Sequence, residues 1–429
     1  MRLLSLPLTF ALSVAVALPV LADPPSSSCP LTGAREAAAA SRAIGNDAAA
    51  IDALNCALNA NFHDADARAD RLVIALGAGR YGLAASDAST LRNNDRARFD
   101  TLVTTTEALS SSNPYDLDTL KLLGLLHWAD ARDDLALNDY QAILASQPSD
   151  VFAFLFRGSS RLYMGDDIHA SADFQQAVNL DTNNPDVYSI IGSTYQQIGN
   201  IFDALMALDR AIALNPQDAR SHYYRGMVLF SNRDVQGAQS EFTLALSCDP
   251  AYVDAYYDRA RASYQLANSN AAISDLDQAL AINPEFDLAL VFRGALHEWA
   301  GETSSATSDL YAYTVAMDAS HLNGGALSPN VPATVSLDTR IVYRFTFEAS
   351  AGETVQLTAT SAQQQADPVL VLLGPDGQTP LSASDDVTPN VHDAVITNVV
   401  LPQTGTYTVL VTHSDSNVRG PVIVTLSVR

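Results

Sequence analysis

The sequence has very little positive charge. Its 24 Lys and Arg residues stand against 48 Asp and Glu, which gives a formal net charge of −24, and Lys121 is its only lysine. Such an acidic chain repels nucleic acid phosphates and anionic lipid head groups, so neither is expected as a partner. The acid excess is expected to serve solubility, with salt adaptation or surface cation binding as the alternatives.

The sequence also lacks the motifs of common enzyme classes. His297-Glu298 begins a zinc-protease pattern, but Gly301 stands where the second His is required. Neither a phosphate-binding Gly-rich loop with a Lys nor a Gly-x-Ser-x-Gly elbow occurs, and the eight histidines are scattered singly. We therefore expect a non-enzyme without a cofactor; a catalytic site would have to be assembled from residues far apart in the sequence.

Long hydrophobic runs are absent after the first residues. Residues 1–22 combine Arg2, an apolar run and small residues before Ala22, which predicts a secretory signal peptide. The alternative is an uncleaved membrane anchor, which Pro7 and Pro19 disfavour. No later run reaches the roughly 18 apolar residues that a membrane span needs. The sequence thus predicts an exported protein, periplasmic or extracellular, with no membrane span in the mature chain.

Cysteine is scarce as well, with three residues in the whole chain. Cys29 precedes the first helix of a predicted N-terminal hairpin, and Cys56 lies late on the returning helix. Antiparallel helices bring these points together, so we predict a Cys29–Cys56 disulfide in an exported protein, worth about 3–4 kcal/mol on the chain-entropy model. Cys248 occupies a column of apolar residues and is expected to be a core thiol.

The sequence does contain a 34-residue period, which runs without a gap through six segments from residue 117 to 320. Two columns, the eighth and the twentieth, hold small residues, and the thirty-second often holds proline. The eighth column reads Gly124, Gly158, Gly192, Gly226, Ala260 and Gly294, and the twentieth is alanine throughout. Two small columns followed by a helix-stopping residue predict two short helices that approach closely and then turn.

This pattern resembles the tetratricopeptide repeat in its period, its small residues and its prolines. The resemblance implies an α-solenoid of helical hairpins, which is a scaffold for binding. Residues 23–116 are interpreted as divergent helical repeats of the same kind, in which 95–112 is either an extra helix or a degenerate half repeat.

An arginine and an acid recur sixteen residues apart within the repeats. The pairs are Arg157 with Asp173, Arg225 with Glu241, Arg259 with Asp275, and Arg293 with Asp309. The repeat at 185–218 has Ile191 and Ala207 at these positions. The pattern predicts an ion pair between the two helices of one hairpin, with a structural rather than catalytic role.

The pattern changes after residue 320. Residues 321–330 are rich in Gly, Pro and Asn and are expected to be a linker. Residues 331–429 alternate apolar and polar side chains between glycine-containing turns, which predicts a small antiparallel β-sandwich. The segments 343–360, 367–378 and 401–413 resemble the bacterial pre-peptidase C-terminal domain, which implies a jelly-roll-like sandwich without a peptidase; a generic adhesive or sugar-binding sandwich is the alternative. The fold class expected for the whole chain is therefore a multidomain α + β protein.

The first helix of each hairpin lines the concave face in the repeat family, and this face is the expected partner-binding surface. It presents aromatic side chains and one arginine, which suit an extended peptide; packing between repeats is the alternative role. The residues are Lys121, Trp128, Phe152, Tyr223, Met227, Phe230, Tyr257, Arg261 and Tyr264.

Acidic residues gather in one part of the sandwich: Asp367, Asp385, Asp386 and Asp393. Oxygen ligands in such a group make it a weak calcium candidate, and solvated acids are the simpler interpretation. No metal is therefore expected.

The function expected from the sequence is that of an exported, non-catalytic scaffold that binds a protein or peptide through the concave face of the solenoid. The alternative is cell-surface adhesion or polysaccharide targeting through the sandwich. Tyr343, Phe345, Phe347 and Tyr407 are the aromatic residues that could stack on sugar there, but their alternation points them inward.

Overall fold

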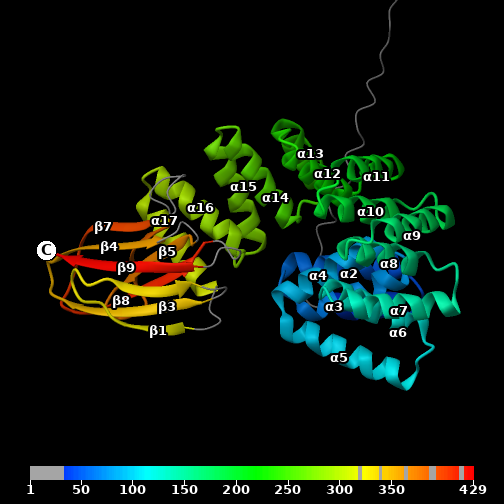
Figure 1. Cartoon of the computed structure of the whole chain (residues 1–429), viewed down its shortest axis with the longest axis horizontal. Coiled ribbons are helices and arrows are strands. Elements are labelled where there is room, and N and C mark those ends of the chain that lie inside the picture. Colours follow the sequence, from blue (N-terminus) through cyan, green and yellow to red (C-terminus); the bar gives the residue numbers. More distant parts are fainter. Residues whose placement is uncertain (1–32, 317–320, 338–340, 362–365, 386–392, 415–419) are drawn as a thin grey trace, which may run out of the picture.

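A computed structural model of the chain shows a helical solenoid followed by a β-sandwich, which confirms the predicted fold class (Figure 1). The structure describes residues 33–316, 321–337, 341–361, 366–385, 393–414 and 420–429. The predicted signal peptide, 1–22, and Cys29 lie outside these residues. No helix within these ranges is both long enough and apolar enough to cross a membrane.

The described part of the chain contains seventeen helices. They are α1 (Ala34–Ala43), α2 (Asp47–Ala60), α3 (Ala65–Gly77), α4 (Tyr81–Asn94), α5 (Arg96–Ser112), α6 (Leu117–Ala129), α7 (Asp133–Ser146), α8 (Val151–Tyr163), α9 (Asp167–Leu180), α10 (Pro185–Gln197), α11 (Ile201–Leu214), α12 (Ala219–Ser231), α13 (Val235–Cys248), α14 (Val253–Gln265), α15 (Ser269–Ile282), α16 (Asp287–Trp299) and α17 (Thr303–Ala316).

The helices form hairpins of chain neighbours, from α1–α2 and α3–α4 to α6–α7 and on to α16–α17, and α5 stands between two hairpins. Short polar side chains fix many helix starts: the Asp150 carboxylate accepts the Ala153 N–H at 2.8 Å, and the Asn268 amide oxygen accepts the Ala271 N–H at 3.2 Å. Between the helices of a hairpin, Gly165 and Gly199 adopt left-handed backbone conformations, with φ of 80° and 78°. Residues 95–112, left open by the sequence, therefore contain one extra helix.

The glycines of the eighth column let the second helix of each hairpin pack against the first. A Cβ atom built on Gly226 would lie 2.6 Å from the Phe242 ring, and one on Gly158 would lie 2.7 Å from the Phe174 ring. Both rings are buried against the opposing helix. The side chain sixteen residues after the glycine thus fills the space that the missing Cβ leaves.

The predicted ion pairs join the two helices of a hairpin. Arg259 donates from Nε and Nη2 to the two carboxylate oxygens of Asp275 at 2.9 and 2.6 Å, and Arg293 pairs with Asp309 in the same way. Arg157–Asp173 and Arg225–Glu241 also form. Arg71 and Asp87, which are sixteen residues apart in α3 and α4, repeat this geometry in the divergent region.

The N-terminal hairpins fold back over the start of the solenoid, because α4 packs against α6 and α10. Tyr81, at the start of α4, contacts Phe152 of α8 with ring centroids 5.5 Å apart. Farther along the chain, His63 forms a 3.0 Å hydrogen bond with Asn283, which follows α15. The first and last thirds of the helical half are therefore joined across the inside of the superhelix.

Nine strands form the sandwich within the described residues. They are β1 (His321–Ala326), β2 (Ala333–Leu337), β3 (Val342–Ala349), β4 (Thr354–Ser361), β5 (Pro368–Leu373), β6 (Pro380–Ser384), β7 (Ala394–Val400), β8 (Gly405–His413) and β9 (Gly420–Val428). One sheet has the strand order β1-β3-β8-β5-β6 and the other β2-β9-β4-β7.

The prediction of a linker at residues 321–330 is wrong for its first part. His321–Ala326 form strand β1, which pairs with β3 and runs parallel to it. The other strand pairs are antiparallel. The Gly-rich composition of this segment suggested a linker, but one of its glycines is needed for packing. A Cβ on Gly324 would lie 2.6 Å from the Phe345 ring. A glycine that permits close approach of an edge strand looks the same in a sequence as a glycine in a flexible linker.

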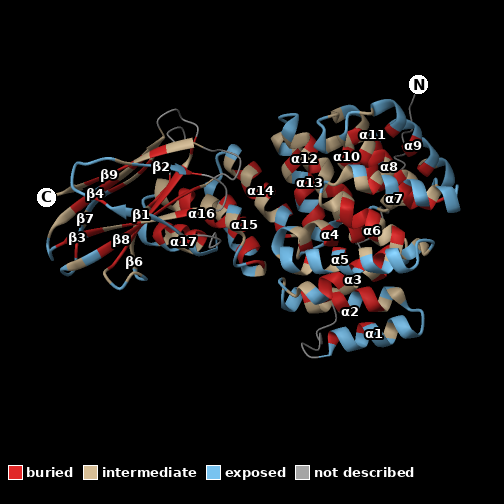
Figure 2. Cartoon of the chain, turned by 60° about the horizontal axis from the view of Figure 1, so that its bottom comes forward, coloured by how far each residue is buried: buried red, intermediate tan, exposed pale blue. Residues whose placement is uncertain are grey.

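The solenoid ends directly on the outer face of the five-stranded sheet, where α17 packs against β5 and β6 (Figure 1). Leu310 and Tyr313 of α17 share one buried cluster with Val369, Val371 and Leu410 of the sheet. Figure 2 shows buried residues running through both halves of the molecule. The two halves therefore share an apolar junction.

Polar contacts reinforce this junction. The carboxylate of Glu298, near the end of α16, accepts the Ser384 hydroxyl at 2.8 Å and the Asp385 N–H at 3.0 Å. The Tyr313 hydroxyl donates to the carbonyl oxygen of His413. Burial raises the pKa of Glu298 above its ordinary value, and the two hydrogen bonds act in the opposite direction.

Candidate functional site

The inner face of the solenoid is built from the first helix of each hairpin, and its exposure changes along the chain. Its inner columns are the second, fifth, ninth and twelfth positions of each repeat. In the first three regular repeats, some residues of these columns, such as Lys121 and Ser193, are half-buried. Others are fully buried, with an exposed fraction of 0%: Leu125, Phe152, Leu155, Ser159 and Ser189. In the next two repeats, no side chain in the same columns is fully buried: Asp254 is exposed and the others are half-buried. The open part of the inner face therefore lies on α12 and α14.

In the first three regular repeats, helix α4 of the same chain packs against the inner face. Besides the Tyr81 ring on Phe152, the N–H of Gly82 approaches the Asp186 carboxylate at 3.4 Å. A Cβ on Gly82 would lie 1.5 Å from the Arg220 guanidinium, so this glycine allows the arginine to lie directly on α4. Helix α4 occupies the space that a partner would take in an open solenoid.

This arrangement corrects the prediction for Phe152. Its side chain is fully buried between Tyr81, Tyr140 and Phe156, so it contacts no partner on the surface. The sequence could not show this, because the covering residue, Tyr81, comes from the divergent region far from α8.

Lys121 and Trp128 lie in the same early part of the solenoid. The Lys121 ammonium pairs with the buried Asp150 carboxylate at 2.7 Å. The Trp128 ring meets Phe156 edge-on, with ring centroids 5.2 Å apart. Both side chains are half-buried and are engaged in contacts between neighbouring repeats.

The later part of the face carries a connected row of half-buried side chains, which we name the aromatic row: Met227, Phe230, Tyr257, Arg261 and Tyr264. The Arg261 guanidinium lies 4.9 Å from the Phe230 ring centroid and 5.8 Å from that of Tyr257. Tyr264 in turn stacks on Trp299 of α16, with centroids 5.7 Å apart. The structure thus brings together five of the nine predicted residues on adjacent helices.

Tyr223, also predicted for this face, is half-buried and packs against the core of the repeat. Its ring packs against Tyr252 and Phe242, and its hydroxyl donates to Asp258 at 2.9 Å. Burial raises the pKa of Tyr223 well above its ordinary value. This environment favours the packing role that the sequence left open for these aromatic residues.

Asp258 sets the electrostatics of the aromatic row. It is 5% exposed and accepts hydrogen bonds from Tyr223 and from Nη1 of Arg261, the latter at 2.6 Å. Burial raises the pKa of Asp258, and the Arg261 charge lowers it. Only one guanidinium nitrogen of Arg261 is used in this pair, so the other N–H groups can donate to a partner.

A cavity of about 910 Å³ lies where the N-terminal hairpins meet the starts of α10, α12, α14 and α16. Four residues line it from the second column of their repeats, the column that also holds Phe152: Asp186, Arg220, Asp254 and Leu288. Burial and the neighbouring Asp258 charge raise the pKa of Asp254 to about 6. The side chain of Asp254 nevertheless remains accessible to solvent within the cavity.

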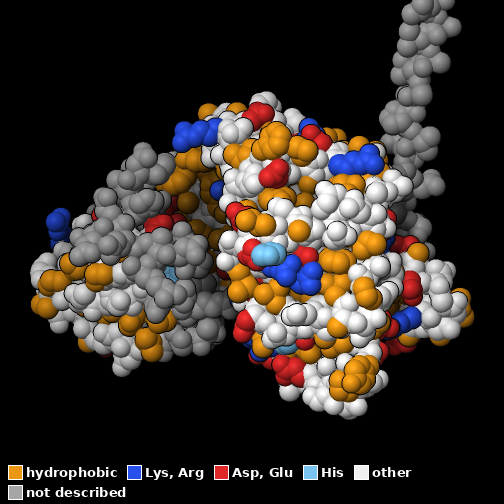
Figure 3. All heavy atoms as spheres, turned by 45° about the vertical axis from the view of Figure 1, so that its right-hand side comes forward, with side chains coloured by type: hydrophobic (Ala, Val, Ile, Leu, Met, Phe, Trp, Pro, Cys, Tyr) orange, Lys and Arg blue, Asp and Glu red, His pale blue; other side chains and the backbone are white. Residues whose placement is uncertain are grey.

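On the face drawn in Figure 3, the helical half shows small, separate groups of hydrophobic, acidic and basic side chains rather than one continuous charged surface. Arginines offset acids locally, as in the pair formed by Arg225 and Asp209 at 3.0 Å. On this face, the acidic side chains are therefore not gathered into a single patch.

The weak calcium candidate gains no support. No group of three or more His, Cys, Asp or Glu residues that could hold a metal ion occurs in the described ranges, and Asp386 lies outside them. Asp393 instead accepts the N–H of Ser361 at 3.1 Å, and Asp385 is 3% exposed, at the junction with Glu298. Asp367 precedes β5, and its backbone carbonyl accepts the N–H of Ser414.

The cysteines divide into two cases. Cys56 of α2 is disulfide-bonded, whereas the predicted partner, Cys29, lies outside the described residues, so the pairing stays a prediction. Cys248 is a free thiol that is half-buried at the end of α13 beside the large cavity. Burial raises the pKa of this thiol, which disfavours the reactive thiolate.

The aromatic residues of the sandwich point inward as predicted. Phe345, Phe347 and Tyr407 are at most 3% exposed, and Phe347 stacks on Tyr407. Tyr343 is half-buried and donates from its hydroxyl to the carbonyl of Ser336. Phe345, Phe347 and Tyr407 therefore offer no exposed platform for a sugar ring.

Comparison with protein families identifies both halves of the fold. The bacterial pre-peptidase C-terminal domain matches residues 342–413, and the tetratricopeptide repeat matches residues 253–286. No curated protein sequence matches the chain.

Among solved structures, the chain is similar to MamA, with 26% identity over 38% of this chain and 95% of that one and a TM-score of 0.33. It is also similar to YrrB, described as a TPR protein with an unusual peptide-binding site, with 24% identity over 43% and 95% of the two chains and a TM-score of 0.31. PilF of Pseudomonas aeruginosa is 17% identical over 48% and 93%, with a TM-score of 0.41.

Proposed function

We propose that this chain, which is built from tetratricopeptide repeats and a pre-peptidase C-terminal domain, is a non-catalytic scaffold that binds an extended peptide on the aromatic row. One observation carries the proposal: the inner columns include fully buried residues in each of the first three regular repeats and none on α12 and α14, where these side chains are half-buried or exposed. The chain therefore leaves one stretch of its inner face open.

The chemistry of this stretch suits a peptide. Phe230, Tyr257 and Tyr264 supply rigid apolar contact at low conformational cost. Arg261 adds N–H donors beside them, held in place by Asp258. Peptide carbonyls or an acidic side chain fit these donors, because a guanidinium binds oxygen acceptors in a fixed planar geometry.

We also propose that the protein acts outside the cytoplasm, in the periplasm or beyond the cell. This part of the proposal rests on the predicted signal peptide, 1–22, and on the predicted Cys29–Cys56 disulfide. The sandwich would then orient the solenoid through the junction formed by Glu298 and Tyr313.

The test is a selection of random twelve-residue peptides on the full chain, followed by affinity measurements on variants. Met227→Ala combined with Phe230→Ala is expected to weaken the selected peptides by about tenfold or more. Phe202→Ala is the matched control, because Phe202 of α11 is 72% exposed and lies outside the inner columns.

Tyr223→Ala is a poor probe, since its ring packs against the core of the repeat. Peptides that bind the Met227→Ala, Phe230→Ala variant as tightly as the unmodified chain would show that the aromatic row is not the site. The folding of each variant is checked by its thermal unfolding transition.

A further inference from the structure

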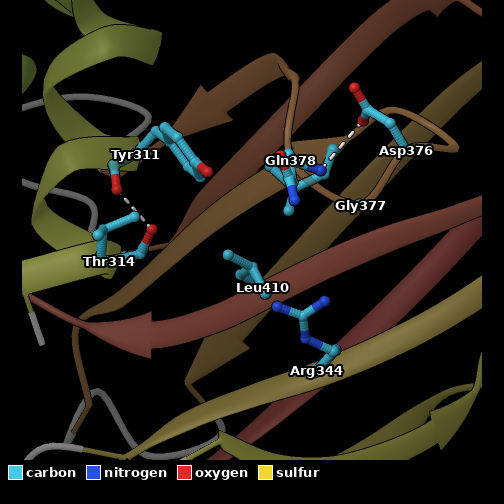
Figure 4. A pocket seen from close by; sticks show the side chains of 9 residues that line it. Tyr311, Thr314, Arg344, Asp376, Gly377, Gln378 and Leu410 are labelled. Carbon is cyan, nitrogen blue, oxygen red and sulfur yellow. Dashed lines mark hydrogen bonds between the residues drawn. The ribbon is translucent and has the colours of Figure 1, made fainter. Parts of the chain in front are cut away.

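A second pocket lies at the junction of the two halves, and it differs in character from the aromatic row. It has a volume of about 380 Å³ and is formed by α17, β3, β8 and the turn between β5 and β6 (Figure 4). This volume is at the lower end of the range for small-molecule sites. Four separate segments thus meet around one small opening.

The floor of the pocket is apolar. Leu410 and Leu373 line it, with exposed fractions of 3% and 1%. Both point outward from the five-stranded sheet, toward the side that α17 covers, because side chains alternate along a strand. Helix α17 covers Leu373 and its neighbours on β5 but leaves an opening beside β3.

Arg344 brings a positive charge to this opening. It lies opposite Leu410 in the β3–β8 pairing and is half-buried. In the part of the chain that the structure describes, its guanidinium forms no ion pair or hydrogen bond, whereas the guanidinium of Arg293 engages two carboxylates. An arginine without an acid is notable in a chain with twice as many acids as bases.

Two further polar groups face the same space. Figure 4 shows the side chains of Tyr311 and Gln378 extending toward the opening from α17 and from the β5–β6 turn. Neither the Tyr311 hydroxyl nor the Gln378 amide is bonded to another described side chain. The pocket thus combines a cation and two hydrogen-bonding groups above an apolar floor.

The one acid in the lining, Asp376, is already engaged. Its carboxylate accepts the N–H groups of Gln378 and Thr379 at 3.0 and 2.9 Å, and the Thr379 hydroxyl as well. These bonds hold the Asp376 carboxylate within the turn. In the part of the chain that the structure describes, Asp376 forms no ion pair with Arg344.

We propose that this pocket binds a carboxylate carried by a small apolar group, with the carboxylate on Arg344 and the apolar part on Leu373 and Leu410. Arginine and carboxylate form strong charge-assisted hydrogen bonds, and a partly buried arginine without a partner favours such a ligand. The C-terminal residue of a peptide and a free small carboxylic acid share this chemistry. The proposal does not depend on peptide binding at the aromatic row.

Calorimetric titration of the full chain tests the proposal with three probes: N-acetyl-leucine, N-acetyl-leucine amide, and acetyl-Ala-Ala-Leu with a free carboxylate. The two acids are expected to bind, and the amide about tenfold more weakly, because it lacks the charge. Tighter binding of the tripeptide would identify a peptide C-terminus as the ligand, and equal binding of the two acids would identify a small carboxylate; either supports the pocket.

Three variants locate the site. Arg344→Met is expected to reduce the affinity for the acids about tenfold, whereas Arg42→Met, which removes the same charge from an exposed position on α1, leaves it unchanged. Val315→Trp narrows the opening from α17 without changing Arg344, and it should also block binding. No heat with any probe at about 10 mM, or equal binding of acid and amide that survives both pocket variants, would overturn the proposal.

Discussion

At the residue scale, the small residues that recur in the eighth column of the repeat are explained by the space that a single Cβ atom would occupy. Each glycine of the eighth column gives its space to one side chain of the opposing helix, and the tightness of that contact varies. The Cβ contact would be 2.6 Å at Gly226, against Phe242, and 3.0 Å at Gly294, against Leu310. The same substitution should therefore have different effects at the two positions.

We predict that Gly226→Ala destabilises the protein, because the buried Phe242 ring must move. Overpacking of this kind costs about 1–3 kcal/mol, against about 1 kcal/mol gained from the better helix propensity of alanine. Gly294→Ala is the matched control and should be close to neutral, since Leu310 can adjust. Denaturant unfolding of both variants measures the difference; equal stability of the two would contradict the packing argument.

At the scale of elements, the ion pair within a hairpin is best understood from the repeat that lacks it. Repeat 185–218 has Ile191 and Ala207 in these two positions and still forms its hairpin, α10–α11. An apolar pair is thus compatible with the fold. An acid or an arginine alone at the same place is expected to destabilise the hairpin, because a partly buried charge then lacks its partner.

We predict that Asp275→Ala costs about 1–3 kcal/mol, because Arg259 loses both of its hydrogen bonds to the carboxylate. The double variant Arg259→Ile, Asp275→Ala copies the natural apolar pair and should recover most of the loss. A double-mutant cycle by denaturant unfolding gives both values. If the double variant is less stable than Asp275→Ala alone, the apolar pair is not an equivalent solution in this repeat.

At the scale of the whole molecule, other parts of the chain pack against the solenoid near both of its ends. Helix α4 fills its early inner face, and the sandwich is packed against its last hairpin. The open aromatic row lies between these two contacts. A partner would therefore meet a surface whose position relative to the sandwich is set by the junction at Glu298.

We predict that Glu298→Ala weakens this junction by about 1–3 kcal/mol, because the buried Ser384 hydroxyl and Asp385 N–H lose their acceptor. Calorimetry should show the melting of the sandwich separating from that of the solenoid. Glu36→Ala, an exposed acid on α1, is the control for the loss of charge. A single unchanged transition would show that the apolar contacts hold the junction alone.

The stability that Glu298 contributes is expected to depend on pH, and the direction follows from its pKa. Since burial raises the pKa of Glu298, the ionised carboxylate is disfavoured in the folded protein. The contribution of Glu298 to stability therefore grows as the pH falls from its folded pKa toward its unfolded pKa. The loss caused by Glu298→Ala should be larger in this range than at neutral pH.

The sequence by itself determined the repeats, the ion pairs sixteen residues apart and the inward aromatic residues of the sandwich. Each of these depends on a local period, so the spacing of residue types is enough to reveal it. The Arg71–Asp87 pair could have been found by the same spacing.

Only the tertiary structure decided which predicted site residues are accessible. Tyr81 covers Phe152 from a helix far away in the sequence, and Gly324 belongs to a strand because Phe345 lies beneath it. Arg344 and Tyr311 line one pocket only because α17 docks on the sheet. These contacts join segments that share no period. Their geometry comes from how the hairpins and sheets pack, which no local pattern specifies.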